Sequence, residues 1–123
     1  MDTEIKSHKD LIVWQKSVDL VEKIYRFTEH FPQREVYALA SQMRRAAVSM
    51  SSNIAEGRSR GTRKDFTHFL HIAFGSASEL ETQLLIAKRL SIGNPAECEA
   101  SEVLLSEVSR MLRAMIKKLE ARS

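Results

Sequence analysis

Residues 62–90 read TRKDFTHFLHIAFGSASELETQLLIAKRL, and this stretch decides the class of fold. Thr62 and Asp65 have the spacing of a capping box, in which side chains bind the free N–H groups at the start of a helix. Beyond this start, apolar residues recur every three or four positions, which is the period of one helix face. They are Phe66, Leu70, Ala73, Ala77, Leu80, Leu84 and Ala87. We therefore predict a long helix, closed by the turn residues of 91–95.

Two helical segments precede this stretch. The first begins near Asp10, or at Ser7, and ends near Phe31, because Pro32 disfavours helical geometry in the residue before it. The second runs from about residue 33 to residue 56. Its apolar face is expected to contain Val36, Met43, Ala47, Met50 and Ile54.

A fourth helical segment follows and reaches toward the C-terminus. Asn94 is expected as its N-cap and Pro95 as its first helical residue. Its apolar face is expected to contain Leu104, Val108, Met111, Met115 and Leu119.

Composition and connection lengths favour a single domain over residues 1–123, with a short N-terminal tail over residues 1–9. Apolar residues make up 43% of the chain and charged residues 28%, an ordinary mixture for a water-soluble globular protein. Four Gly and two Pro are too few for the many tight turns of an all-β fold. Short connections make neighbouring helices antiparallel, so we expect an all-α fold, an antiparallel up-down-up-down four-helix bundle.

Two of the four segments carry more apolar surface than a monomeric bundle needs. In the first segment, the seam of Leu11, Trp14, Val18, Val21 and Tyr25 is accompanied by a second apolar seam, and the third segment also has apolar residues outside its main stripe. Exposed apolar patches of this size are unusual in monomers. We therefore expect a homo-oligomer whose interface contains Val13, Leu20, Ile24, Phe27, Ile72, Phe74 and Leu85. A bundle splayed enough for one core to use both seams is the alternative.

Positive charge is concentrated between the second and third segments. Residues 34–64 carry seven Lys or Arg and two Asp or Glu. Four of these cations fall within eight residues, at Arg58, Arg60, Arg63 and Lys64. Such a turn, next to the free N–H groups of a helix start, has an affinity for phosphate. We expect these cations to bind phosphate, assisted by Arg44 and Arg45; a solvated loop is the alternative.

The second segment also has a polar stripe opposite its apolar face. It contains Gln42, Arg45, Ser49, Ser52, Asn53 and Glu56. Ser and Asn compete for backbone hydrogen bonds and are mediocre helix formers, so their presence indicates another role. We expect a structural polar network of Gln42, Asn53, Glu56 and Glu79, with a salt bridge from Glu79 to Arg44 or Arg45.

Catalytic and metal-binding patterns are missing from the sequence. His68 and His71 stand one helical turn apart, a spacing that zinc can use, but no Cys or carboxylate stands beside them at a matching offset. Cys98 has no obvious base beside it. We expect no enzyme activity, no cofactor, no metal and no small-molecule substrate.

Location and membrane contact follow from equally simple observations. The single Cys cannot form an internal disulfide, and no N-terminal stretch has the apolar core of a secretory signal. No apolar run approaches the ~20 residues that span a bilayer. A cytoplasmic location without a membrane partner is expected.

Three segments of the chain resemble the bacterial four helix bundle protein family, also described as the 23S rRNA intervening-sequence proteins. They are DLIVWQK at residues 10–16, QMRRA at residues 42–46 and NIAEG at residues 53–57, and the resemblance covers about residues 8–120. Members are encoded inside insertions in ribosomal RNA genes. The resemblance implies a four-helix bundle in a homopentameric ring. The RNA-binding accessory variability protein of diversity-generating retroelements is a distant, more basic cousin.

Two hypotheses on function follow from the residues and the resemblance. In the first, a non-enzymatic pentameric bundle binds RNA or a ribonucleoprotein through the basic turn between the second and third helices. In the second, the protein is a protein-protein interaction scaffold with no role in nucleic-acid binding.

Overall fold

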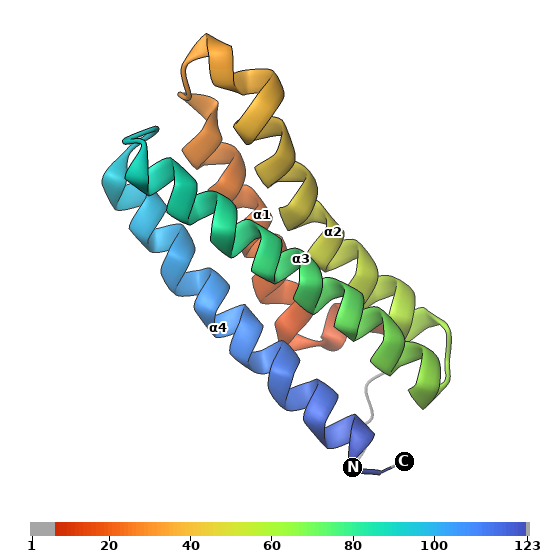
Figure 1. Ribbon diagram of the computed structural model, residues 1–123. Helices are drawn as coiled ribbons and strands as arrows, with labels where there is room; N and C mark the ends of the chain where they lie inside the picture. Colours follow the sequence, from red (N-terminus) through yellow and green to blue (C-terminus); the bar gives the residue numbers. More distant parts are fainter. Residues whose placement is uncertain (1–6, 123) are drawn as a thin grey trace.

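The computed structural model describes residues 7–122, which form four long α-helices and no strands (Figure 1). Residues 1–6 of the expected N-terminal tail lie outside the described residues. The all-α class is confirmed. The helices are α1 (Ile12–Glu29), α2 (Ser41–Ser59), α3 (Arg63–Arg89) and α4 (Pro95–Glu120).

Each helix returns alongside the one before it, as the colours of Figure 1 show. Arg44, near the start of α2, donates a hydrogen bond from Nε to Thr28 Oγ1 near the end of α1, at 2.8 Å. Ser51, midway along α2, bonds to Ser17 in the first half of α1, with 2.9 Å between the hydroxyl oxygens. The start of α1, the turn between α2 and α3, and the end of α4 consequently lie at one end of the molecule.

Two predicted helix starts are confirmed by their caps. Thr62 Oγ1 accepts a hydrogen bond from the Asp65 backbone N–H at 3.1 Å. Asn94 Oδ1 accepts one from the Glu97 backbone N–H at 3.0 Å, and Pro95 is the first residue of α4. In both places the side chain satisfies an N–H group that has no partner within the helix.

The other two helix starts differ from the prediction. Ser7 caps only a short 3₁₀ turn, η1 (His8–Asp10), and α1 begins after it at Ile12. The predicted second helix begins as a 3₁₀ turn, η2 (Gln33–Glu35), followed by a π-helical turn, η3 (Val36–Ala40). The extended backbone of Pro32, with ψ of 149°, ends the preceding segment, so the chain regains α-helical geometry only at Ser41.

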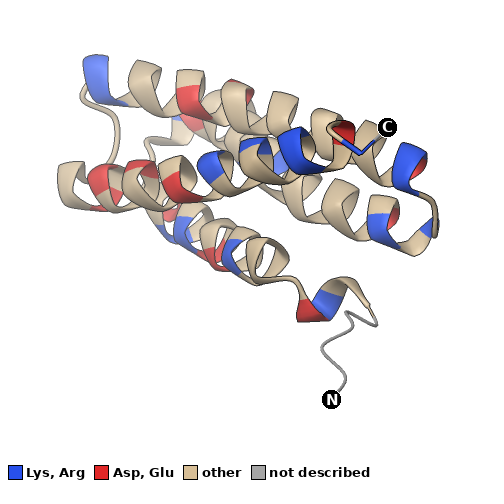
Figure 2. Ribbon diagram, turned by 90° about the horizontal axis from the view of Figure 1, so that it is seen from below, with Lys and Arg blue, Asp and Glu red and all other residues tan. Residues whose placement is uncertain are grey.

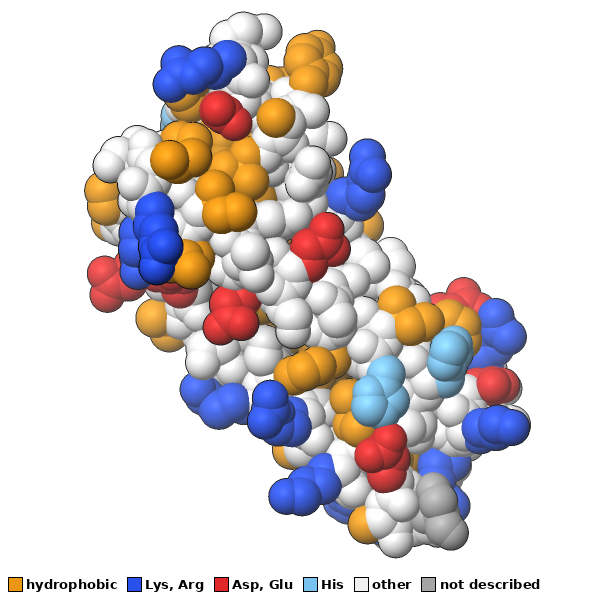
Figure 3. All heavy atoms as spheres, viewed as in Figure 1, with side chains coloured by type: hydrophobic (Ala, Val, Ile, Leu, Met, Phe, Trp, Pro, Cys, Tyr) orange, Lys and Arg blue, Asp and Glu red, His pale blue; other side chains and the backbone are white. Residues whose placement is uncertain are grey.

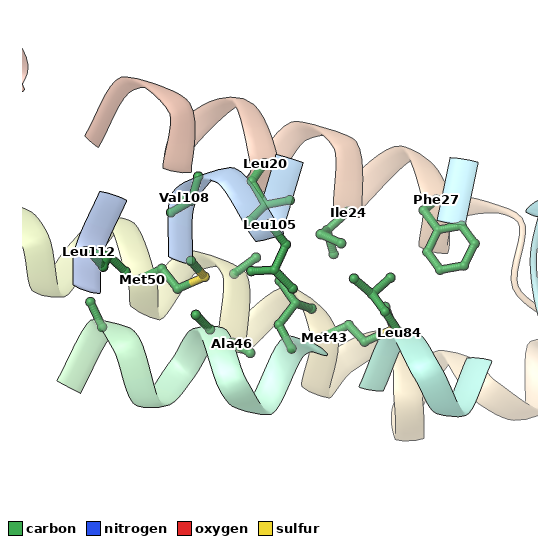
Figure 4. Close-up of a cluster of buried hydrophobic side chains, with 14 of the residues drawn as sticks. Leu20, Ile24, Phe27, Met43, Ala46, Met50, Leu84, Leu105, Val108 and Leu112 are labelled. Atoms are coloured by element: carbon green, nitrogen blue, oxygen red, sulfur yellow. The ribbon is translucent and has the colours of Figure 1, made fainter. Parts of the chain in front are cut away.

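Side chains from all four helices meet in one apolar core, shown in Figure 4. The core faces of α2 and α3 are the predicted ones, with only Val36 and Phe66 half-buried. In α2, for example, Met43, Ala47 and Met50 are fully buried.

The core face of α1 is not the predicted one. Val13, Leu20, Ile24 and Phe27, which we expected at an oligomer interface, are at most 1% exposed within the single chain. Ser17 is also fully buried and completes their heptad spacing. This polar residue interrupts the apolar pattern of the buried face. The seam that begins with Leu11 and Trp14 has no such interruption, so the sequence pattern favoured it as the core face. The interface prediction is therefore wrong for these four residues.

In α4 the core face is likewise shifted from the prediction. Leu105, Leu112 and Ile116 are buried, as is Val108, whereas the predicted Leu104, Met111, Met115 and Leu119 are half-buried at the flank. The buried set again includes a serine, Ser101, at 0% exposure. A small side chain at a core position lets two helices approach each other closely.

The three interface residues predicted on α3 have a different position. Ile72 and Leu85 are exposed, while Phe74 is half-buried beneath the Arg113 guanidinium, whose carbon lies 5.3 Å from the ring centroid. The surplus of apolar surface on α3 is thus present in the single chain, whereas the four α1 residues predicted at the interface are buried.

Gly57 fixes the position of the turn between α2 and α3. A Cβ atom on this residue would lie 2.7 Å from Phe69 Cβ and 3.3 Å from the Phe66 carbonyl oxygen. Only glycine allows the last turn of α2 to approach α3 this closely. The close contact brings the cations that follow it next to the start of α3.

Within residues 7–122, no helix has the length and apolar character needed to cross a membrane.

Candidate anion-binding site

The turn from Arg58 to Lys64, named the basic turn here, is built from the end of α2 and the start of α3. Gly61 adopts the left-handed conformation, with φ of 85°, which reverses the chain at little steric cost. Thr62 then caps α3. The first N–H groups of α3 and the positive end of its dipole therefore lie beside the cations of the turn.

Arg60 of the basic turn already has an acidic partner. Its Nε lies 2.8 Å from Glu56 Oε2, one turn earlier in the chain, and about half of each side chain is exposed. The guanidinium carbon also lies 5.0 Å from the centroid of the Phe69 ring. This ion pair orients the guanidinium and offsets part of its charge.

Arg63 joins the basic turn to the end of α4. One of its terminal nitrogens donates a hydrogen bond to the backbone carbonyl of Arg122 at 3.2 Å. Lys64, the next residue, is exposed. The contact places the last cations of α4 in the same neighbourhood as those of the turn.

A pocket of about 520 Å³, named the end pocket here, opens between the basic turn, the start of α1 and the end of α4. Among residues 7–122, four cations line it and no carboxylate does. Its full lining is Leu11, Arg58, Gly61, Thr62, Arg63, Phe66, Met115, Lys118, Leu119 and Arg122. It therefore combines four cations with the apolar side chains of Leu11, Phe66, Met115 and Leu119, which are named its apolar floor here.

Sequence reasoning missed the contribution of α4 to this site. Lys118 and Arg122 are more than fifty residues from the basic turn, and only the packing of α4 beside α3 brings them to it. Residues 56–65 and 117–122 together hold seven Lys or Arg and three Asp or Glu. In Figure 2 several blue segments lie at the end of the bundle that holds the end of α4, and others lie along the helices and at the opposite end.

Arg44 and Arg45 do not join the basic turn. They lie in the first turns of α2, so about 20 Å of helix separates them from Arg58. The Arg44 guanidinium lies over the ring of Tyr25, 4.8 Å from its centroid, and also donates to buried Thr28. Their predicted assistance to the basic turn is therefore not supported by the geometry.

The predicted salt bridge to Glu79 is wrong. None of the ion pairs among residues 7–122 joins Glu79 to Arg44 or Arg45. Arg44 turns toward α1 instead, and Glu79 is exposed and accepts a long hydrogen bond of 3.5 Å from Gln83.

The polar stripe of α2 forms a smaller network than predicted. Asn53 donates to the carbonyl and the hydroxyl of Ser49, at 2.8 and 3.0 Å, and Ser49 bonds to Ser76 of α3 at 2.9 Å. Glu56 instead pairs with Arg60. Gln42 is exposed and has no side-chain hydrogen bond within the described part of the chain. The network thus joins α2 to α3 through Ser49, and Asn53 is the one predicted residue of the four that contacts Ser49 within the described part of the chain.

His71 and Cys98, two residues considered for chemistry in the sequence, contact other helices or are buried. His71 Nε2 lies 2.7 Å from Glu120 Oε2, which ties α3 to the end of α4. No group of three or more His, Cys, Asp or Glu suited to a metal occurs among residues 7–122. Burial raises the pKa of the Cys98 thiol, and nearby Glu102 raises it further.

Comparisons with known proteins agree with the fold. A family model described as 23S rRNA-intervening sequence protein matches residues 9–114. A similar solved structure is that of a protein of unknown function from the S23 ribosomal protein family of Bacteroides thetaiotaomicron. The two chains share 26% sequence identity with a TM-score of 0.77, over 86% of this chain and 96% of the other. A search of curated proteins found no match.

Proposed function

Since the chain belongs to the 23S rRNA-intervening sequence protein family, we propose that it is a non-enzymatic RNA-binding protein of the cytoplasm. The basic turn contacts the phosphate backbone of RNA, either free or within a ribonucleoprotein. The observation that carries the proposal is the concentration of cations from α2, α3 and α4 at one end of the bundle.

The chemistry of the basic turn suits a phosphate backbone. Lys and Arg neutralise phosphates and release bound counterions, which gives an affinity that depends strongly on salt. Exposed Lys64 and Arg63 lie beside the free N–H groups at the start of α3, which also favour anions. Contacts of this kind hold RNA in position and carry little sequence information.

We further propose that the protein assembles into a homo-oligomeric ring. The resemblance to the family implies that this ring is a pentamer. The exposed apolar side chains of α3 support such an interface: Ile72, Leu85, Ile86 and Leu90 are between 39% and 64% exposed. A ring repeats the basic turn once per subunit, so several phosphates of one RNA are bound at once, and the affinity rises by multivalency.

The test is RNA binding by a charge-reversed variant and a matched control. Fluorescence anisotropy of a labelled structured RNA at ~50 mM salt is compared for wild type and for a variant with Arg58, Arg60, Arg63 and Lys64 changed to Glu. We expect the variant to bind about 100-fold more weakly or not at all. The control reverses four cations elsewhere, Lys23, Arg26, Arg34 and Arg89, and so has the same net charge. Equal affinities for the two variants, or no binding by wild type, contradict the proposal.

A protein-protein scaffold is the second candidate function, and the opposite end of the molecule favours it. Exposed apolar side chains gather there, around the last turns of α3 and the start of η3, and Figure 3 shows part of this surface. Tyr37 is 88% exposed and Leu90 is 64% exposed. The test is a pull-down from host lysate after nuclease treatment. A partner protein that is captured by wild type and not by Leu90→Glu supports this function.

A further inference from the structure

We infer that the end pocket binds the terminal nucleotide of an RNA chain, with the terminal phosphate among its four cations and the base on its apolar floor. This inference rests on the proposed function and specifies which part of the RNA the site takes. It is argued from the charge of the pocket, its floor and its size.

The charge of the end pocket fits a terminal phosphate better than an internal one. Within the described part of the chain, its lining holds four cations and no carboxylate. A phosphate monoester at a chain end carries about −1.5 to −2 charges near neutral pH, by analogy with phosphorylated side chains, and a phosphodiester within the chain carries only one. Since Coulomb attraction scales with charge, the same cations hold the monoester more strongly.

The cations of the pocket come from separate elements that are tied together. Arg58 and Arg63 flank the turn between α2 and α3, and Arg122 follows α4. The bond from Arg63 to the Arg122 carbonyl uses one of the five N–H donors of the guanidinium, so the remaining donors stay available for phosphate oxygens. Cations held on two sides can bind several oxygens of one phosphate together.

The apolar floor of the end pocket favours a nucleotide over a bare phosphate as the ligand. Phe66, Met115 and Leu119 are half-buried, and the remaining part of each side chain is exposed. Nucleic-acid bases stack on aromatic faces and contact apolar surface in many RNA-binding proteins. The volume of about 520 Å³ lies within the range of roughly 300–1,000 Å³ found for small-molecule sites.

The first experiment measures small ligands by isothermal titration calorimetry. Adenosine 5′-monophosphate supplies both the base and the monoester; ribose 5-phosphate and adenosine each lack one of them. We expect the nucleotide to bind at least tenfold more tightly than either fragment. Equal affinity for the nucleotide and ribose 5-phosphate overturns the role of the floor and therefore the inference.

A matched pair of variants locates the binding. Lys118 lines the end pocket, whereas Lys117, the preceding residue of α4, does not. Both are exposed, so neither change threatens the core. We expect Lys118→Glu to weaken nucleotide binding at least tenfold and Lys117→Glu to weaken it less than threefold. Equal effects of the two changes overturn the assignment.

The second experiment separates this inference from the proposed function. One short RNA is prepared with a 5′-phosphate, with a 3′-phosphate and with hydroxyl groups at both ends. We expect a phosphate at one of the two ends to increase the affinity of wild type at least fivefold and to leave that of Lys118→Glu unchanged. The end at which the phosphate has this effect is the end of the RNA that the pocket binds. Equal binding of all three RNAs overturns the inference and leaves the proposed function standing. Binding of the mononucleotide without any binding of longer RNA overturns the proposed function and, with it, the inference.

Discussion

The hydroxyl of Ser17 on α1 lies 2.9 Å from the hydroxyl of Ser51 on α2, and Ser17 is completely buried. The Ser17 hydroxyl also donates a hydrogen bond to the Trp14 carbonyl of its own helix, at 2.6 Å. This polar contact between two helices satisfies the Ser17 hydroxyl inside the core. Ser17 can therefore lie on the same buried face of α1 as Ile24 and Phe27.

The first prediction concerns this contact. Ser17→Ala removes a buried hydroxyl and leaves the Ser51 hydroxyl without its partner, so we expect the free energy of unfolding to fall by about 1 kcal/mol. Urea denaturation followed by circular dichroism at a fixed protein concentration measures the change. An unchanged midpoint contradicts the role given to the contact.

Ser101 provides the contrasting case in α4. Its hydroxyl is buried and has no hydrogen-bond partner among the described residues. Removing this hydroxyl breaks no hydrogen bond and leaves no other polar group without a partner, so it costs little free energy of unfolding. In the same denaturation experiment, we expect Ser101→Ala to leave the stability unchanged or to increase it. A loss as large as that of Ser17→Ala speaks against this difference.

Two glycines give a second comparison. At Gly57 an added Cβ meets Phe69 Cβ at 2.7 Å, whereas at Gly75, within α3, it meets nothing within 4 Å. We expect Gly57→Ala to destabilise the protein by about 1–3 kcal/mol through overpacking. Gly75→Ala is expected to stabilise it by up to ~1 kcal/mol through helix propensity. Thermal unfolding of the two variants checks the signs, and a stabilising Gly57→Ala disagrees with the close packing of α2 on α3.

The Cys98 thiol supplies a prediction on pH. Burial raises its pKa above the ordinary value, so the thiol in the folded protein stays protonated over a pH range in which an unfolded cysteine begins to ionise. The unfolded state therefore binds fewer protons in that range, and stability falls as the pH rises through the unfolded pKa.

Thiol reactivity measures this state of Cys98 directly. At pH 8 we expect a disulfide reagent such as dithionitrobenzoate to react slowly with the folded protein and rapidly with protein in denaturant. The Cys98→Ser variant gives the background. Rapid reaction in the folded state at low reagent concentration is the result at odds with a buried, protonated thiol.

Assembly is tested through the exposed apolar residues of α3. We expect light scattering of wild type at micromolar concentration to give a mass several times the 14.0 kDa of one chain. Leu85→Glu places a charge on that surface and is expected to lower the mass. Ile12→Glu, at an exposed apolar position of α1, serves as the control. A wild-type mass of 14.0 kDa excludes the ring.

Periodicity and capping residues predicted much of the fold, including the caps at Thr62 and Asn94 and the core faces of α2 and α3. They failed for the faces of α1 and α4, where Ser17 and Ser101 occupy core positions. An apolar pattern cannot assign a buried serine, because its burial depends on a partner or on close packing with another helix. The site was predicted only in part for a similar reason: the contribution of Lys118 depends on how the helices return.

The salt dependence of RNA binding tests the central claim most directly. The affinity of wild type for a labelled RNA is measured at several salt concentrations, beside the variant with the four cations of the basic turn changed to Glu. If each of the four cations neutralises one phosphate, the slope of log affinity against log salt is about −3 per subunit engaged for single-stranded RNA. We predict a slope at least this steep for wild type and a much shallower one for the variant. Equal slopes for the two proteins contradict the account.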